Sequence, residues 1–181
     1  MANIITYPLL FVFALSPSFI WLAFYLRKDA HPEPNPMIRK VFLWGMLATL
    51  PAIALELGLR SLFSLLPFPT EIILILYIFL GVAFMEELLK FLVVRSSVYK
   101  SKALDEPLDV MLYMIIAALG FAAFENILIL FGLGPSSPIS QIAALTLVRL
   151  VGATFLHALA SGTLGYFLAR SFFDPKKKYW Y

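Results

Sequence analysis

The chain has 181 residues, of which 61% are hydrophobic and 14% are charged, and its formal net charge is +3. This composition is typical of a small polytopic membrane protein, and no polar stretch reaches the roughly 50 residues of a separate soluble domain, so residues 1–181 are expected to form one membrane domain. The absence of cysteine excludes thiol nucleophiles and cysteine-bound metals, and the modest basic charge gives no reason to expect a nucleic-acid partner.

Five stretches are apolar over the roughly 20 residues that a helix needs to cross a bilayer. Backbone exposed to lipid must satisfy its own hydrogen bonds, so all five are expected to be helices of an all-α bundle. The first has no basic segment before it and no small-residue cleavage site, which indicates a retained anchor. Breaks follow at "HPEPNP", "LPFPT" and "GLGPSSP", and Ser140 is expected to cap the last helix. The predicted spans are about 4–26, 38–60, 71–95, 108–132 and 141–170.

Basic residues flank alternate connections between these spans. They lie between the first and second spans, between the third and fourth, and after the fifth, whereas the opposite connections contain only Arg60. The positive-inside rule then places the N-terminus outside and the C-terminus in the cytoplasm, as expected for a multi-pass protein of the cytoplasmic membrane. The flanking basic residues are Arg27, Lys28, Arg39, Lys40, Arg95, Lys100, Lys102, Arg170, Lys176, Lys177 and Lys178.

The third span contains two adjacent carboxylates, Glu86 and Glu87. Ionisable groups inside a membrane are costly and usually face a protein interior or a water-filled cavity. On a helix the two glutamates point about 100° apart, and Lys90 lies one turn beyond Glu86 on the same face. Lys90 is therefore expected to neutralise part of the charge of Glu86 and to leave Glu87 as the freer carboxylate. A buried ion pair that only fixes packing is the alternative, although it would need only one glutamate.

In the fourth span, Glu125 shares a helical face with Ala118, Phe121 and Ala122. The small residues on this face permit close approach of another helix. Asn126 follows directly and offers an amide that is suited to polarise a carbonyl or to hold an oxyanion. Taken alone, an interhelical hydrogen bond explains the glutamate equally well.

In the fifth span, His157 interrupts a stripe of small residues spaced by four, formed by Ala153, Ser161 and Gly165. This spacing predicts that the imidazole faces another helix at close range. A lone histidine inside a membrane is commonly a packing residue, but three glutamates in neighbouring spans favour a site.

Together these residues supply the groups that hydrolysis by an activated water requires. Zinc accepts imidazole nitrogen and carboxylate oxygen while keeping one position open for water, and a spare carboxylate then acts as general base. We expect Glu87, Glu125 and His157 to hold zinc or another divalent ion. The predicted catalytic residues are Glu86, Glu87, Glu125, Asn126 and His157. Weaker candidates are Asp109, which fits a charge at a helix N-terminus, Arg149, a counterion or packing partner, and Glu56, which is expected to be structural.

Four motifs in order resemble the PrsW family of intramembrane proteases: "HPEP", "EELLK", "DVMLYMIIAALGFAAFEN" and "RLVGATFLHALASG". The resemblance covers about residues 29–165 and implies a helical bundle with a hydrophilic cavity inside the membrane. It also implies hydrolysis of a peptide bond in a membrane-anchored protein, such as a regulator of the anti-sigma-factor kind. By motif, the functional positions would be Glu86, Glu87, Glu125 and His157, with Asn126 adjacent.

The chain departs from the wider superfamily of CAAX-processing and bacteriocin-processing proteases, whose members often have two histidines within the spans. Here the second histidine, His31, falls in the "HPEP" connection and is expected at the cytoplasmic surface. One imidazole with three carboxylates leaves open weak zinc binding, a harder metal, or a metal-free water activated by glutamate. The alternative functions are a proton-coupled transporter or channel, for which discontinuous helices and repeats are expected but not evident, and a catalytically silent scaffold.

Overall fold

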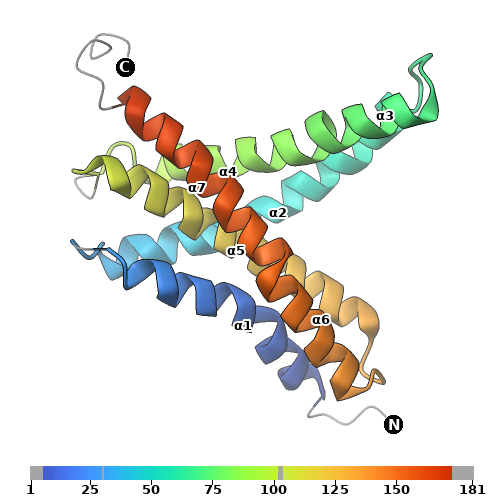
Figure 1. The fold of residues 1–181 in the computed structure, drawn as a ribbon, viewed down its shortest axis with the longest axis horizontal. Helices are drawn as coiled ribbons and strands as arrows, with labels where there is room; N and C mark the ends of the chain where they lie inside the picture. The colour runs from blue at the N-terminus through green and yellow to red at the C-terminus, as the bar shows by residue number, and fades with distance from the viewer. Residues whose placement is uncertain (1–5, 30, 102–103, 173–181) are drawn as a thin grey trace.

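The structure is a computed structural model that describes residues 6–29, 31–101 and 104–172 (Figure 1). Within these ranges the regular secondary structure is entirely helical, as predicted, and contains no strand. The elements are α1 (Thr6–Leu26), α2 (Asn35–Phe63), α3 (Thr70–Leu76), the π-helix η1 (Tyr77–Ala83), α4 (Phe84–Ser97), α5 (Pro107–Leu133), α6 (Ile139–Val151) and α7 (Ala153–Phe172).

Within the described residues, five helical segments are long and apolar enough to cross a membrane, and their bounds agree with the predicted spans to within a few residues at most ends. Proline residues precede α2, α3 and α6, and α5 ends at Gly134, whose φ of 81° lies in the region that favours glycine. The prediction that Ser140 caps the last helix is wrong, because α6 already begins at Ile139 after Pro138. The spans are Tyr7–Leu26, Asn35–Phe63, Thr70–Ser97, Pro107–Leu133 and Ile139–Ser171.

Two of the five spans are not continuous α-helices, although the sequence shows no evident discontinuity. The third span passes through η1 between α3 and α4, and the last span breaks at Gly152, between α6 and α7. A Cβ atom at Gly152 would lie 2.7 Å from the carbonyl oxygen of Val148, so the backbone of this break has no room for a side chain. The break directly precedes the helix that carries His157.

Helix α5 is the centre of the molecule. In the most apolar 18-residue stretch of each span, 67% of the residues of α5 are buried, against 33% or fewer in the other spans. Helix α5 packs mainly against α7, α2 and α1. The α2 and α5 backbones touch where they cross, because a Cβ on Gly45 would collide with the carbonyl oxygen of Ala117 and one on Gly120 with that of Phe42. The neighbouring helices therefore pack around α5, which is the most buried of the spans.

The start of α5 explains Asp109. Its Oδ2 accepts hydrogen bonds from the backbone amides of Glu106 at 2.6 Å and Asp105 at 3.0 Å, and the side chain of Glu106 completes a capping box. The interpretation of Asp109 as a charge at the helix N-terminus is thus confirmed.

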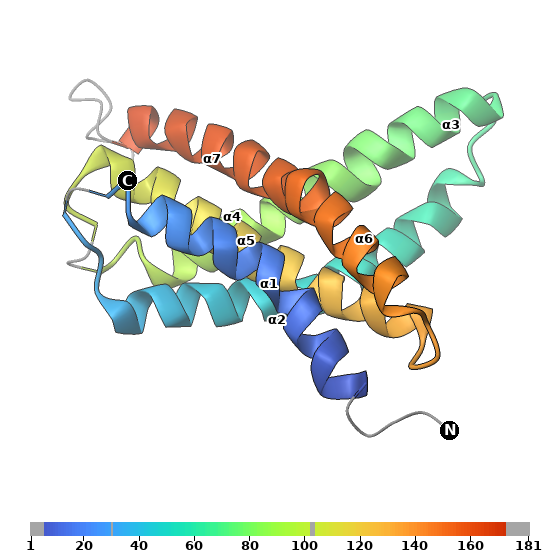
Figure 2. The same ribbon diagram turned by 60° about the horizontal axis from the view of Figure 1, so that its bottom comes forward.

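The described helices form a V in both views (Figures 1 and 2). One arm contains the second half of α2 with α3 and η1, and the other contains the end of α5, α6 and the start of α1. At the closed end, the connection after α1 meets the connection before α5, where His31 Nδ1 lies 2.8 Å from Glu106 Oε1. His31 is exposed there and is not part of the compact group formed by Glu86, Glu125 and His157. Helices α4, α5 and α7 come together between the arms and the closed end.

Candidate active site

Three helices bring the predicted ionisable residues together. Glu86 and Glu87 lie in the first turn of α4, Glu125 on α5 and His157 on α7. His157 Nε2 lies 2.9 Å from Glu125 Oε2, and His157 Nδ1 lies 3.5 Å from Glu86 Oε2. The imidazole therefore stands between two carboxylates from different helices, at the face that the four-residue spacing on the last span predicts.

Lys90 closes this arrangement on the α4 side. Its Nζ lies 3.1 Å from Glu86 Oε2, 2.8 Å from Glu87 Oε1 and 3.0 Å from His157 Nδ1. The helical spacing predicts the pairing of Lys90 with Glu86. The contact with His157 crosses between two helices, and no signal in the local sequence could have revealed it.

Lys90 pairs with Glu87 as well as with Glu86, so the prediction that Lys90 would leave Glu87 as the freer carboxylate is wrong. Oε1 of Glu87 accepts from Lys90, and its Oε2 accepts a hydrogen bond of 2.6 Å from the hydroxyl of Ser161. Only Oε2 of Glu86 is contacted among the described residues. Ser161 is one turn beyond His157 in the small-residue stripe, and the stripe explains its size but does not indicate its role as a donor.

Arg149 and Asn126 form the opposite side of the site. Arg149 Nη2 donates to Glu125 Oε2 at 3.0 Å, which identifies Arg149 as the counterion of a site carboxylate. Arg149 Nε donates to Asn126 Oδ1, and Asn126 Nδ2 donates to the hydroxyl of Thr154 at 3.3 Å. Asn126 is fully buried, and both the oxygen and the nitrogen of its side-chain amide are hydrogen-bonded, to Arg149 and Thr154 respectively.

The donor atoms fit a divalent metal ion. One ligand atom each from Glu86, Glu125 and His157 lies within 4.8 Å of the other two, and two carboxylate oxygens with one imidazole nitrogen form a donor set suited to zinc or a harder divalent ion. The predicted ligands are Glu87, Glu125 and His157, so the compact group contains Glu86 in the place expected for Glu87.

A cavity of about 180 Å³ reaches the site from the space between α2 and α5. Glu125 and Glu56 both line it, with Thr49 and Phe121 among its other walls. Glu56 has no hydrogen-bond partner among the described residues. Sequence reasoning assigned Glu56 a structural role and missed its place beside Glu125, because the two residues share a cavity wall only through the packing of α2 against α5.

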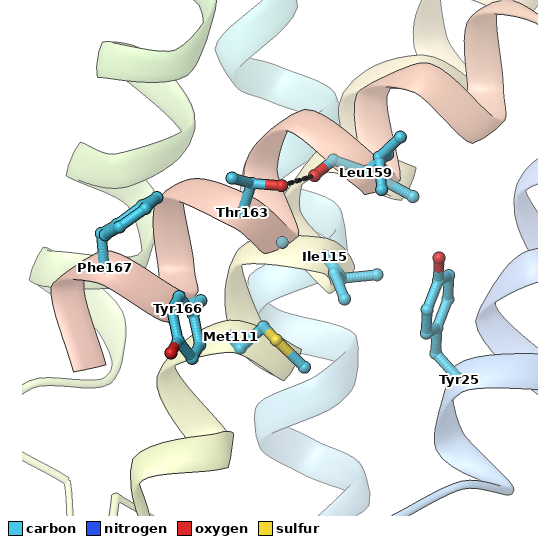
Figure 3. A pocket seen from close by; sticks show the side chains of 9 residues that line it. Tyr25, Met111, Ile115, Leu159, Thr163, Tyr166 and Phe167 are labelled. Carbon is cyan, nitrogen blue, oxygen red and sulfur yellow. Dashed lines mark hydrogen bonds between the residues drawn. The ribbon is translucent and has the colours of Figure 1, made fainter. Parts of the chain in front are cut away.

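A second cavity, of about 370 Å³, lies between α1, α5 and α7 (Figure 3). Apolar side chains such as Met111 and Ile115 line it. The hydroxyl of Thr163, on its wall, donates a hydrogen bond to the backbone carbonyl of Leu159 in the same helix. None of the ionisable residues of the site borders this cavity.

Comparison with known proteins gives a consistent result. Residues 33–181 match the profile described as the PrsW family intramembrane metalloprotease. The chain is 30% identical over 158 residues to Protease PrsW of Geobacillus kaustophilus, covering 87% of this chain and 64% of that protein, which is just under two thirds of its length. It is 28% identical to the proteins of the same name from Bacillus subtilis (90% of this chain, 69% of that protein) and Clostridioides difficile (93% and 68%). No solved structure gives a significant match.

Proposed function

The chain belongs to the PrsW family of intramembrane metalloproteases, as its motifs predict, and on this premise we propose that it is an endopeptidase that hydrolyses a peptide bond of a membrane-anchored protein. The observation that carries the proposal is the meeting of Glu86, Glu125 and His157, from three helices, with one ligand atom of each within 4.8 Å of the other two. Such a group is costly inside a membrane and has the composition of a hydrolytic site.

In this proposal, Glu86, Glu125 and His157 hold a divalent ion, which supplies Lewis-acid polarisation of water and of the scissile carbonyl when it is bound. Arg149 compensates part of the charge of Glu125 and keeps its carboxylate in place. Asn126 and Thr154 in turn fix Arg149 through a buried chain of hydrogen bonds. The role of Asn126 is then to position a neighbouring group, and its amide as an oxyanion donor remains the alternative to test.

Glu87 is the proposed general base. Ser161 and Lys90 hold its two oxygens in one orientation, and each carboxylate oxygen keeps a second lone pair that can accept a proton from water. A fixed carboxylate beside the group that binds the cation is the geometry that proton abstraction requires. The substrate is proposed by class alone: the family resemblance implies a membrane-anchored regulator of the anti-sigma-factor kind.

The proposed setting is the cytoplasmic membrane, with residues 1–181 acting as one domain. Five helices able to span a bilayer support the membrane location. The polypeptide substrate would enter between the arms of the V, where the cavity lined by Glu56 and Glu125 reaches the site.

The test compares purified wild type with Glu86→Gln, Glu87→Gln and His157→Ala in proteoliposomes that contain a panel of fluorescent single-span peptides. Loss of Glu87 is expected to reduce cleavage by at least about 10²-fold, the usual contribution of a general base, and loss of the metal ligand His157 is expected to reduce it at least as much. Elemental analysis should find bound metal reduced by Glu86→Gln and His157→Ala but retained by Glu87→Gln. Glu71→Gln, an exposed carboxylate on α3 of the same span, is the matched control and should keep full activity.

Unchanged cleavage by both Glu87→Gln and His157→Ala would contradict the assignment of these residues. A folded wild type that cleaves no peptide of the panel, but moves protons across the vesicle membrane, would favour the transporter instead. Folding of each variant is checked by size-exclusion chromatography before either conclusion is drawn.

A further inference from the structure

Lys90 is the most deeply buried charged residue of the described chain. Its side chain is 0% exposed, and its ammonium lies 4.5 Å from the centre of the Phe121 ring in addition to its contacts with Glu86, Glu87 and His157. Three acceptor atoms at 2.8–3.1 Å thus surround one positive charge. Two of these acceptors, on Glu86 and His157, come from residues of the compact group that could hold a metal ion.

The ammonium fixes the hydrogen of the imidazole. A lysine ammonium has three hydrogen-bond donors and no acceptor, so Nδ1 of His157 must accept from Lys90. The ring hydrogen then lies on Nε2 and is donated to Glu125 at 2.9 Å. Both nitrogens of the ring are thereby occupied.

A metal ion can bind His157 through either nitrogen, and each choice conflicts with Lys90. At Nδ1, the ion would take the lone pair that accepts from the ammonium. At Nε2, the ring hydrogen would move to Nδ1 and would face the ammonium, donor against donor. Both arrangements require that Lys90 release the imidazole.

We infer that Lys90 and a divalent ion compete for His157 and Glu86, so that the ammonium is a resident cation that the metal must displace. This inference rests on the proposed metal-assisted function and adds a regulatory residue to that site. The displaced ammonium retains two of its partners, Glu87 Oε1 and the face of Phe121, without leaving the protein interior. Lys90 therefore weakens metal affinity and prevents the carboxylates of Glu86 and Glu87 from standing uncompensated when no metal is bound.

The experiment measures the affinity for zinc alone, by competition with a chromogenic chelator, in detergent-solubilised wild type, Lys90→Met and Arg149→Met. Lys90→Met removes the resident cation and keeps an unbranched side chain only one atom shorter, and we expect it to bind zinc at least tenfold more tightly than wild type. Arg149→Met is the matched control for net charge: Arg149 also touches a carboxylate of the group, at 3.0 Å, but does not contact His157. Its gain in affinity should be smaller than that of Lys90→Met.

Zinc affinity of Lys90→Met equal to or below that of wild type, or no greater than that of Arg149→Met, would overturn the inference. So would the absence of zinc binding in wild type and Lys90→Met alike. If Lys90→Met does not give a monodisperse protein, Lys90→Gln removes the charge with a polar side chain and is judged by the same criteria. Zinc affinity is measured without substrate, so the two proposals can fail separately. If wild type cleaves peptides but Lys90→Met gains no zinc affinity, only this inference is contradicted. If Lys90→Met binds zinc more tightly but wild type cleaves no peptide, only the proposed protease function is contradicted.

Discussion

At the scale of single residues, the hydrogen bond from Ser161 to Glu87 has a testable consequence. A hydrogen bond to a charged group contributes about 1.5–3 kcal/mol, and this one fixes the oxygen opposite to Lys90. We expect Ser161→Ala to lower kcat about tenfold, equivalent to about 1.4 kcal/mol of transition-state stabilisation, and to leave KM unchanged. Steady-state cleavage of the best peptide of the panel provides both constants.

Thr163→Ala is the control for Ser161→Ala, because it deletes a hydroxyl of the same helix whose one hydrogen bond within the described residues goes to the Leu159 carbonyl. It should change neither constant. An equal fall of kcat in both variants would mean that α7 is disturbed as a whole and that Ser161 has no particular part in holding Glu87.

Glu33, in the connection between α1 and α2, predicts a dependence of stability on pH. Burial raises the pKa of Glu33 from 4.5 to about 7, with further increases from Asp109 and Asp29, while the 2.6 Å hydrogen bond from Tyr113 acts in the opposite direction. The folded protein therefore holds this proton more tightly than the unfolded chain does. The free energy of unfolding should fall as pH rises from about 4.5 to about 7 and should receive no further change from Glu33 above that range.

Thermal unfolding in detergent at pH 5, 6, 7 and 8 measures this effect. Glu33→Gln, which cannot ionise, should remove the part of the decline that falls between pH 5 and 7. Glu71→Gln, an exposed carboxylate, should retain it. A decline of the same size in Glu33→Gln would assign the pH dependence to other groups.

Residue types and helical spacing are sufficient to predict the members of the site but not how they pair. The faces of Glu125 and His157 follow from periods of three to four residues, and the contact of Lys90 with Glu86 follows from one helical turn. The contacts of Lys90 with His157 and of Ser161 with Glu87 join residues 67 and 74 positions apart, and they depend on the rotation of each helix about its axis. Hydrophobic periodicity alone fixes that rotation poorly in spans that are apolar on nearly every side.

At the scale of helices, the crossing of α2 and α5 is the tightest packing that the glycines reveal. We expect Gly120→Ala to destabilise the protein by about 1–3 kcal/mol or more, because its Cβ would meet the backbone of Phe42, which cannot move aside as a side chain can. Gly58→Ala on α2 is the control, since no atom lies within 4 Å of the place that its Cβ would take and alanine favours a helix. Thermal unfolding of the two variants checks the prediction, and equal stability would contradict the close crossing.

The helices themselves could largely be predicted from the sequence, because length, hydropathy and proline leave few choices for a span. The interruptions could not. Gly152 has an ordinary sequence neighbourhood, and it is the nearby carbonyl of Val148, a feature of the folded backbone, that makes the break specific to glycine. The π-helix from Tyr77 to Ala83 likewise contains no proline or charged residue that would indicate an interruption of the α-helix.

At the scale of the whole molecule, the orientation in the membrane remains a prediction. The connections after α1 and before α5 lie at one end, joined by His31 and Glu106, and described basic residues such as Arg27 and Arg95 flank the helices there. Since the chain has no cysteine, single cysteines can report the side of each end. An impermeant thiol reagent should label Ser136→Cys in intact cells and should label Pro32→Cys only after permeabilisation. The opposite pattern would invert the proposed topology.

The π-helix that joins α3 to α4 also sets how far α3 is rotated about the helix axis relative to the site residues Glu86 and Glu87 on α4. A π-helical segment behaves as an α-helix with an inserted residue, and each residue of an α-helix turns the chain by about 100°. Deleting one residue between Tyr77 and Ala83 would restore the regular ladder and rotate α3 by about that angle relative to Glu86 and Glu87. The face of α3 that meets lipid is thus set by η1, whereas the direction of Glu86 and Glu87 is set by the packing of α4. A deletion in η1 would therefore turn a different face of α3 toward the lipid and leave the two glutamates in place.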